Sequence, residues 1–279
     1  MRTVILGALA GLMLAGPAVA DVLSEIAERG SIRLGVRADA APFSYRDEKG
    51  RASGLAVALC SEVTRRIALQ VGQPEMKTDF VTVTAAERFP ALLEGRTDLH
   101  CGPASATLKR RETLDFSILY FVDGATAAVR PGTYESVFDA RLGKVGVLAG
   151  TTTVDVVSDL LARNGVDAEV VTFTSHVRGL DALANNKLDL YFGDQAILLF
   201  QIASQGLSDY LAVMDEHYSF EPYALVMRRD ESDLRLAVDR ALSEIYTDGA
   251  IYRLIQSALG DFPLSDEARA VYQIVGMPE

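Results

Sequence analysis

Residues 84–120 read TAAERFPALLEGRTDLHCGPASATLKRRETLDFSILY, and the interpretation of the chain starts from this stretch. It predicts a short helix that carries Arg88, then a strand, a small-residue loop at 102–105, and a second helix with Arg110 in its first turns. Two guanidiniums would flank a loop that can direct backbone N–H groups and the Ser105 hydroxyl at a ligand. Guanidinium groups stay charged and bind carboxylates in a bidentate manner. The stretch therefore indicates a binding site for a small anion.

Helix and strand signals alternate around this stretch. The 31–37 segment alternates apolar and polar residues and predicts a strand, and an apolar residue at every fourth position predicts a helix over 55–69. Strands are also predicted over 79–83 and 97–101. Thr84 and Glu87 form a capping box at the start of the Arg88 helix, which Gly95 ends. This order is typical of an α/β unit with a mostly parallel sheet.

The same pattern begins again downstream and predicts a second α/β unit. Its strands are expected over 144–148, 169–173 and 188–192. Its helices are expected after Gly150-Thr151-Thr152 to about 163, over 175–184 with Val177, Leu180 and Leu183 facing inward, and from Asp194 to about 204.

Two extended apolar segments, 124–130 and 223–229, can each cross from one unit to the other. Helices over 231–247 and 249–259 would then complete the first unit. The fold class is therefore α/β with two lobes and a hinge. The ligand is expected in the cleft, near the carboxyl ends of parallel strands.

The first 20 residues have the features of a secretory signal peptide. Arg2 is followed by an apolar run over 4–15 and by Ala18-Val19-Ala20, a small-x-small cleavage site before Asp21. The alternative, a membrane anchor, needs about 20 apolar residues. We therefore expect a mature chain, 21–279, that is soluble and exported to a bacterial periplasm.

Composition limits the possible partners. The formal charge is −11 for the whole chain, and removing Arg2 with the signal peptide makes it −12, which argues against nucleic acid and anionic membranes. The three histidines, at 100, 176 and 217, are scattered, so neither a metal nor a cofactor is predicted. In an oxidising compartment Cys60 and Cys101 are expected to form a disulfide, with two buried free thiols as the alternative.

Several motifs, taken in order, resemble the periplasmic solute-binding proteins of polar amino acid ABC importers, family 3 type, and most of all the glutamate/aspartate-binding members. The likeness covers essentially the whole mature chain with nearly gap-free spacing. The matching segments are GVRADAAPFSY at 35–45, the 83–117 segment, GTT at 150–152, SH at 175–176, FGDQ at 192–195, YALVMRR at 223–229 and LSDE at 264–267.

The resemblance implies the type II fold of periplasmic binding proteins, with a hinge of two crossing strands. Lobe 1 would hold residues 21–127 and 226–279, and lobe 2 would hold residues 128–225. The chain would be the substrate-binding component of an amino acid ABC transporter, without catalysis, as a monomer that delivers its ligand to an inner-membrane permease.

The resemblance also assigns ligand contacts. Arg37 and Arg88 would hold the side-chain carboxylate of a glutamate- or aspartate-like ligand, assisted by His176. Helix capping is the plain alternative for His176, and solvated surface positions are the alternatives for the two arginines.

The α-amino-acid end of the ligand would use different residues. The resemblance gives the α-carboxylate to Arg110, to the Ser105 hydroxyl and to the helix N-terminus at Thr152, and it gives the α-ammonium to Asp194. Asp194 could instead be a helix cap. Phe43 either packs under the ligand or belongs to the ordinary core.

Other positions have structural interpretations or depart from the family pattern. Arg111 is expected at the surface and Thr107 as a helix cap, while His100 and His217 are expected to be structural or exposed. Ala85 and Pro103 stand where the acidic-amino-acid binders usually have serines, so hydrogen bonds to the ligand side chain are lost. The sequence therefore supports an amino acid ligand more firmly than a particular one.

Two other functions remain possible from the sequence. One is a cyclohexadienyl (prephenate/arogenate) dehydratase-like enzyme on the same fold, for which Glu87 and Glu221 are the candidate general acids. These two acids show no convincing catalytic arrangement. The other is a binding protein linked to a sensor, with the same cleft.

Overall fold

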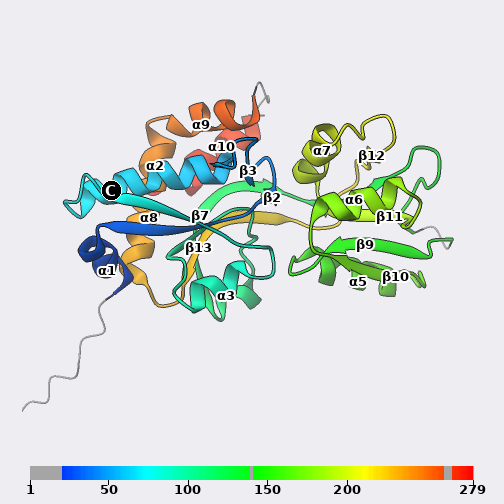
Figure 1. Cartoon of the computed structure of the whole chain (residues 1–279), viewed down its shortest axis with the longest axis horizontal. Helices are drawn as coiled ribbons and strands as arrows, with labels where there is room; N and C mark the ends of the chain where they lie inside the picture. The colour runs from blue at the N-terminus through cyan, green and yellow to red at the C-terminus, as the bar shows by residue number, and fades with distance from the viewer. Residues whose placement is uncertain (1–20, 139–140, 261–265, 279) are drawn as a thin grey trace, which may run out of the picture.

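The computed structural model describes residues 21–138, 141–260 and 266–278, which form two lobes side by side (Figure 1). The predicted signal peptide and the first half of the 264–267 motif lie outside the described residues. Each lobe is built on one five-stranded sheet, and we name them lobe 1 and lobe 2 after these sheets. No helix in the described part of the chain is long and apolar enough to cross a membrane.

The sheet of lobe 1 combines parallel and antiparallel pairs. Its order is β5 (Lys77–Thr82), β1 (Ser31–Val36), β6 (Leu99–Cys101), β13 (Glu221–Arg228) and β7 (Leu114–Asp123). β1 is parallel to β5 and β6, whereas β13 is antiparallel to β6 and β7. The sheet is mostly parallel, as predicted, and only the returning strand β13 runs opposite to the other four.

Helices cover both faces of this sheet. One face carries the long helices α2 (Leu55–Gln70), α8 (Ser232–Thr247) and α9 (Ala250–Leu259), and their apolar residues form the largest described core with β1 and β6. The other face carries α3 (Arg88–Leu93) (Figure 1). The remaining elements of the lobe are α1 (Val22–Arg29), α4 (Leu108–Arg111), α10 (Asp266–Val275) and a small sheet of β2 (Asp39–Ala40), β3 (Ser44–Arg46) and β4 (Ala52–Ser53).

Lobe 2 repeats the layered arrangement. Its sheet has the order β10 (Glu169–Phe173), β9 (Lys144–Leu148), β11 (Leu190–Asp194), β8 (Ala125–Val129) and β12 (Ala212–Val213). Its helices are α5 (Thr153–Arg163), α6 (His176–Ala184) and α7 (Gln195–Ser204). Apolar residues of α5 pack on one face of the sheet, and those of α6 and α7 pack on the other.

The predicted helices and strands are confirmed, with one wrong side-chain assignment in α6. Val177 is 45 % exposed, whereas Leu180 and Leu183 are fully buried. The inward stripe of this helix is His176, Gly179, Leu180 and Leu183, which is the i, i+3, i+4, i+7 pattern. Val177 lies one residue beyond that stripe and therefore faces outward.

The predicted disulfide is present. Cys60 of α2 and Cys101 at the end of β6 are bonded, and their Cα atoms are 6.0 Å apart. The link closes a sequence separation of 41 residues, and a closed loop of this size contributes about 2–4 kcal/mol of stability in the chain-entropy account. It fixes α2 to the strand that leads into the 102–105 loop.

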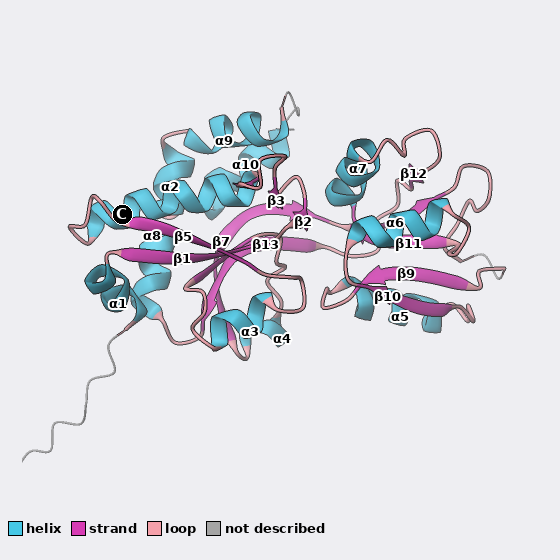
Figure 2. Cartoon of the chain, in the orientation of Figure 1, coloured by secondary structure: helices cyan, strands magenta, loops and turns pink. Residues whose placement is uncertain are grey.

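Two neighbouring crossings of the chain connect the lobes, as Figure 2 shows for β7 and β13. Glu221 pairs with Asp123 where the crossings meet. Gly124 allows this approach, because a Cβ there would lie 2.6 Å from His217 Cδ2 and 2.8 Å from the Ser219 carbonyl oxygen. The lobe limits at 127/128 and 225/226 stay predictions; β8 spans the first limit and β13 spans the second.

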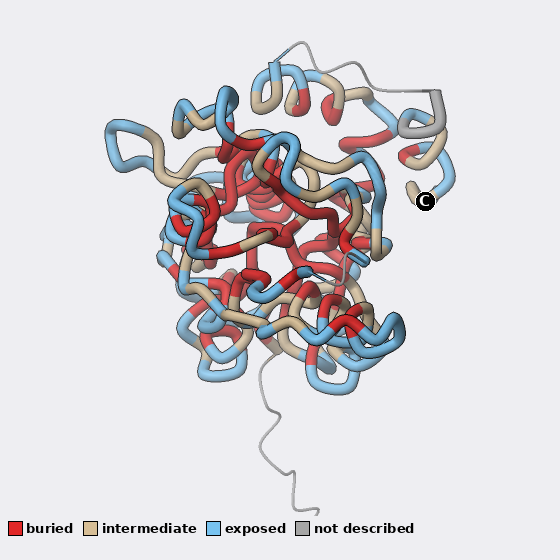
Figure 3. Tube along the Cα trace, turned by 90° about the vertical axis from the view of Figure 1, so that its right-hand side faces the viewer, coloured by how far each residue is buried: buried red, intermediate tan, exposed pale blue. Residues whose placement is uncertain are grey.

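The interior is apolar, and polar side chains gather where the lobes meet. In the view along both lobes, buried backbone occupies the middle and exposed loops the edge (Figure 3). Three of the few buried charged or ionisable side chains, Arg37, Arg88 and Glu221, come from segments next to the crossing strands.

Candidate ligand-binding site

Four strand ends converge between the lobes. Arg37 follows β1, the 102–105 loop follows β6, Thr152 lies beyond β9, and Asp194 ends β11. A cavity of about 20 Å³ lies there, between lobe 1 and lobe 2. It is lined by Arg37, Pro103, Leu148, Thr151, Thr153, His176, Phe192, Gly193, Asp194 and Ile197. Three predicted site residues, Arg37, His176 and Asp194, are therefore brought together.

This space holds little more than one water molecule, so the described conformation is a closed one. Contacts across the cleft agree with that. Gln201 Nε2 of lobe 2 donates to the Asp39 carbonyl oxygen of lobe 1 over 3.0 Å. Gly150 approaches lobe 1 so closely that a Cβ there would lie 3.0 Å from the Ala86 Cα. A ligand can enter only when the lobes separate.

Arg37 is buried with a counter-ion. Its side chain is 2 % exposed, and Nη2 lies 2.7 Å from Asp39 Oδ1. Nε donates to the same oxygen over 2.8 Å, and the backbone N–H donates to Ser44 Oγ over 2.9 Å. Asp39 therefore offsets the charge of Arg37 within the protein itself.

Arg88 is buried to the same degree and lacks such a partner. Its Nη1 donates to the Ala85 carbonyl oxygen, while Nε has no hydrogen-bond partner among the described residues. The guanidinium carbon lies 4.3 Å from the centre of the Phe89 ring. Burial, together with repulsion from Arg110 and Arg37, lowers the pKa of Arg88 well below its ordinary value. A buried cation without an anion is costly, so this position favours an anionic ligand group.

Arg110 also lies over the Phe89 ring. Its guanidinium carbon is 5.0 Å from the centre of Phe89, and Nη1 donates to the Ser105 carbonyl oxygen over 2.9 Å. Burial lowers the pKa of Arg110, and Glu221 and Asp194 partly offset that shift. Thr107 caps α4 through its hydroxyl, which accepts from the Arg110 N–H over 3.2 Å, as predicted. Arg111 is exposed, also as predicted.

Acidic groups face these arginines from the hinge and from lobe 2. Asp194 accepts a hydrogen bond from the Tyr223 hydroxyl. Burial raises the pKa of Asp194 to about 7, and repulsion from Asp123 and Glu221 adds to the shift. Burial raises the pKa of Asp123 to about 6, although the N–H groups of Gly124 and Ala196 donate to it over 2.9 and 3.2 Å. A cation placed here would relieve the repulsion between these carboxylates.

The hydroxyls assigned to the α-carboxylate are donors to a protein carboxylate. Ser105 Oγ and Thr152 Oγ1 both donate to Glu221 Oε2, the latter over 2.9 Å. Ser219 Oγ donates to Glu221 Oε1 over 2.6 Å. The Glu221 side chain is buried at the start of β13. The roles of Ser105 and Thr152 in ligand contact stay predictions.

His176 and Phe43 support the site in different ways. His176 lines the cavity, and its Nδ1 lies 3.1 Å from the Tyr191 hydroxyl. Burial and the nearby Arg37 lower the pKa of His176 to about 4, so the ring is neutral at pH 7. Phe43 is fully buried in the core of lobe 1, with its ring centre 5.2 Å from that of Tyr223. Phe43 thus lies one layer below Asp194, and its contact with a ligand stays a prediction.

Sequence reasoning gave no place in the binding site to four polar groups that complete it, although it named Glu221 as a candidate general acid of the alternative enzyme. Asp39 pairs with Arg37, Tyr223 donates to Asp194, and Asp123 and Glu221 supply the other buried carboxylates. One signal was available, because these acids and the tyrosine stand within or next to the predicted crossing segments and strand ends. The sequence does not show which of these side chains point into the space between the lobes, because that depends on how the two crossing segments pack together.

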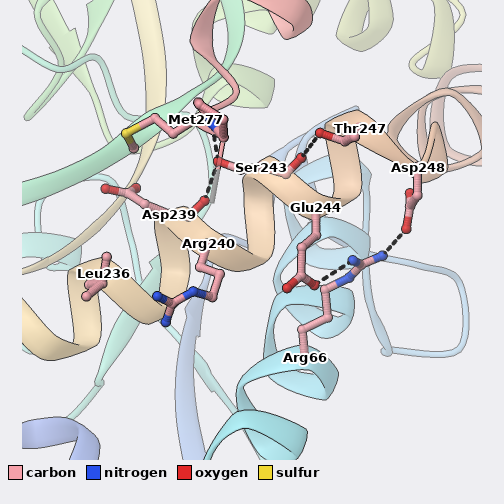
Figure 4. A pocket seen from close by; sticks show the side chains of 10 residues that line it. Arg66, Leu236, Asp239, Arg240, Ser243, Glu244, Thr247, Asp248 and Met277 are labelled. Carbon is pink, nitrogen blue, oxygen red and sulfur yellow. Dashed lines mark hydrogen bonds and ion pairs between the residues drawn. The ribbon is translucent and has the colours of Figure 1, made fainter.

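A larger hollow lies away from this cleft, on lobe 1 between α2, α8 and residues 277–278 (Figure 4). Its volume is about 630 Å³. Arg66 at its wall is paired with Glu244 and Asp248, at 2.8 and 2.5 Å, so this arginine joins two helices. Within 21–138, 141–260 and 266–278, no cluster of histidine, cysteine and acidic side chains could hold a metal ion.

The fold and the charged interlobe cavity define a two-lobed solute-binding protein. The chain belongs to the bacterial extracellular solute-binding proteins, family 3, whose sequence profile matches residues 32–261. This finding confirms the resemblance drawn from the motifs. The chain is accordingly a solute-binding protein and not an enzyme.

Named relatives and solved structures that are similar to this chain are also amino acid-binding proteins. An L-glutamate/L-aspartate-binding protein of Pseudomonas aeruginosa is 26 % identical, over 94 % of this chain and 92 % of its own. A glutamate/aspartate import solute-binding protein of Escherichia coli is 23 % identical, over 93 % and 89 %. The structure of an ancestral arginine-binding protein bound to glutamine has a TM-score of 0.74 and 27 % identity, over 84 % and 99 %.

Proposed function

We propose that the chain is the periplasmic substrate-binding component of an amino acid ABC importer. Its ligand is an amino acid with a second anionic group, of the glutamate or aspartate type. It acts as an exported monomer that captures the ligand between its lobes and delivers it to a membrane permease. The names of the two glutamate/aspartate relatives support the transport role.

One observation carries the ligand class: charges of opposite sign lie uncompensated on the two sides of the site. Arg88 and Arg110 form no ion pair with an acid among the described residues, although both lie against Phe89. Across from them, burial and mutual repulsion hold Asp194 at a raised pKa. An α-ammonium offsets the acids, and two carboxylates offset the two guanidiniums, because charge-assisted hydrogen bonds are strongest between such partners.

The protein offers fewer hydrogen-bonding groups to the side chain of the ligand than to its α-amino-acid end. Ala85 contributes its backbone oxygen to Arg88, and Pro103 at the cavity wall has no N–H to donate. Arg88 and neutral His176 are then the main groups for a distal carboxylate. We expect the affinity for glutamate or aspartate to rest on charge more than on hydrogen-bond number.

The experiment is a binding screen of refolded residues 21–279 by thermal shift and calorimetry against the common amino acids and small dicarboxylates. Ligands that bind the folded state raise the melting temperature by mass action. We expect glutamate or aspartate to give the largest shift. A shift with uncharged amino acids alone would reject the acidic ligand and keep transport. No shift with any compound would reject the proposed ligand class.

The alternative functions find less support in the site. Glu87 is exposed and accepts from Thr84, which makes it part of the helix cap. Glu221 accepts hydrogen bonds from three hydroxyls of the protein, an arrangement that positions a carboxylate without directing it at a substrate. A sensor role would use the same closed cleft, and genetic proximity to a permease and an ATPase would favour transport.

A further inference from the structure

Glu221 lies at the meeting point of both lobes and the hinge. It begins β13, whose pairing with β7 places it opposite Asp123 at the crossing. Its three hydroxyl donors come from three different segments. Ser105 belongs to the loop after β6 in lobe 1, Thr152 precedes α5 in lobe 2, and Ser219 lies in the return crossing. The Glu221 carboxylate therefore links lobe 1, lobe 2 and the hinge through hydrogen bonds.

The lobe 1 side of this arrangement is fixed by the backbone. Ser105 forms an isolated bridge with Tyr223, the Ala106 N–H donates to the Pro222 carbonyl oxygen over 2.8 Å, and the Ala224 N–H donates to the Ala104 carbonyl oxygen over 3.1 Å. Ser105 and Glu221 consequently move as one unit. Of the three hydroxyl bonds to Glu221, the one from Thr152 is the one that reaches across the cleft.

The lobe 2 side attracts a carboxylate. Thr152 is the N-cap of α5, an 11-residue helix. Its backbone is already helical, its side chain accepts no capping hydrogen bond, and its hydroxyl donates to Glu221. A helix N-terminus carries partial positive charge and free N–H groups that favour an anion. The family resemblance gives this position to the ligand's α-carboxylate, yet in the structure the Thr152 hydroxyl donates to a carboxylate of the protein.

We propose that Glu221 is a positioning residue that clasps the two lobes, and that the Ser105 and Thr152 hydroxyls act through it rather than by holding the ligand. This inference rests on the proposed amino acid-binding function. It leaves Arg110 as the principal side chain for the α-carboxylate. Loss of the clasp should reopen the cleft and speed ligand release, while ligand preference should stay the same.

A double-mutant cycle on the ligand dissociation rate tests the clasp. L-Glutamate release is followed by stopped flow for the wild type, Thr152→Val, Glu221→Ala and the double variant. A hydrogen bond to a charged group justifies an expected rise of about tenfold for each single variant. In the Glu221→Ala background, Thr152→Val should change the rate less than twofold. An equal effect in both backgrounds would mean that Thr152 contacts the ligand, and the proposal would be wrong.

Small-angle scattering of the ligand-free protein gives an independent readout. Glu221→Ala and the isosteric Glu221→Gln should increase the radius of gyration relative to the wild type, because the open form gains population. Glu216→Ala is the matched control, since Glu216 is an exposed acid that accepts from the Tyr218 hydroxyl at 3.0 Å. Unchanged scattering in both Glu221 variants would overturn the clasp. The scattering experiment tests the role of Glu221 even if the wild type binds none of the amino acids. That result would reject the proposed function and leave the inference about Glu221 to be decided by the scattering.

Discussion

The site has two oppositely charged sides. We call Arg88 and Arg110 in lobe 1 the cationic wall, and Asp194 and Asp123 at lobe 2 and the hinge the acidic wall. In both walls, charged groups are partly or fully removed from water and form no ion pair in the part of the chain that the structure describes. Arg88 is buried and Arg110 is half-buried, and neither forms an ion pair with an acid among the described residues. Asp194 and Asp123 are half-buried near each other, and both have raised pKa values. Each wall is unfavourable alone, and the zwitterionic ligand that we propose would offset both at once. The charges that the protein leaves unpaired would therefore contribute to the binding energy when the ligand pairs with them.

Arg37 shows the contrast within one wall. It is as deeply buried as Arg88, yet Asp39 already offsets its charge. A ligand carboxylate therefore gains less from Arg37 than from Arg88. Burial of an arginine is thus a poor guide to ligand binding, and the absence of an internal partner is a better one.

Replacement of Asp194 should break the acidic wall and have the largest effect. Asp194→Asn keeps the size of the side chain but removes the charge that faces the α-ammonium. Losing one partner of a buried ion pair costs about 3–5 kcal/mol, so calorimetry should show affinity for the amino acid reduced at least a hundredfold. Asp159→Asn, an exposed acid on α5, is the control. Retention of affinity within threefold would rule out Asp194 as the ammonium acceptor.

Replacement of Arg88 should break the cationic wall selectively. Arg88→Ala should lower affinity for glutamate and aspartate tenfold or more, because a distal carboxylate loses its uncompensated partner. Affinity for glutamine, which has no distal charge, should change much less. The exposed Arg111→Ala is the matched control. If glutamate and glutamine lose affinity equally, the assignment of Arg88 to the side-chain end is wrong.

Gly150 tests whether the two walls must come together. Its φ of +77° and the nearby Ala86 backbone disfavour any side chain. Gly150→Ala should weaken binding about five- to thirtyfold, because a Cβ 3.0 Å from the Ala86 Cα opposes closure, and a cost of about 1–2 kcal/mol in the closed form alone changes affinity by that factor. The left-handed φ lowers the stability of the open and the closed form alike. Gly165→Ala carries the same backbone cost, with φ +66° and nothing within 4 Å. Both variants should lose stability, but only Gly150→Ala should lose affinity; equal affinity losses would exclude a closure effect.

The smallest expected effect is on pH-dependent stability. The pKa of Asp194 is raised from 3.8 to about 7 in the folded chain, so the folded state binds more protons than the unfolded state between these values. The contribution of Asp194 to stability is complete below about pH 4 and is lost as the pH rises through 7. Ligand-free wild type should therefore melt a few degrees below Asp194→Asn at pH 8, with a smaller gap at pH 5. A gap independent of pH would contradict the shift.

Most of the fold could be predicted from local sequence. The four-residue spacing of Leu55, Leu59, Val63 and Ile67 defines α2, and the Thr84–Glu87 capping box is formed as expected. Val177 was placed wrongly because periodicity leaves the phase of a short helix uncertain by one residue. In the site, the candidate residues were named from their motif positions. Asp39 lies inside the 35–45 motif and Glu221 was considered only as a general acid, while Asp123 lies outside every quoted motif.

The sequence by itself determined the two α/β units, the crossing segments, the disulfide partners and the presence of several arginines and an aspartate at strand ends. These features follow from periodicity, capping and residue chemistry, which act over a few residues. Only the tertiary structure decided which charges remain unpaired. Arg37 meets Asp39 within two residues, but Glu221 meets Ser105 and Thr152 across 116 and 69 residues. Compensation of a buried charge depends on such distant neighbours, because the interaction requires contact in space and gives no periodic pattern along the chain.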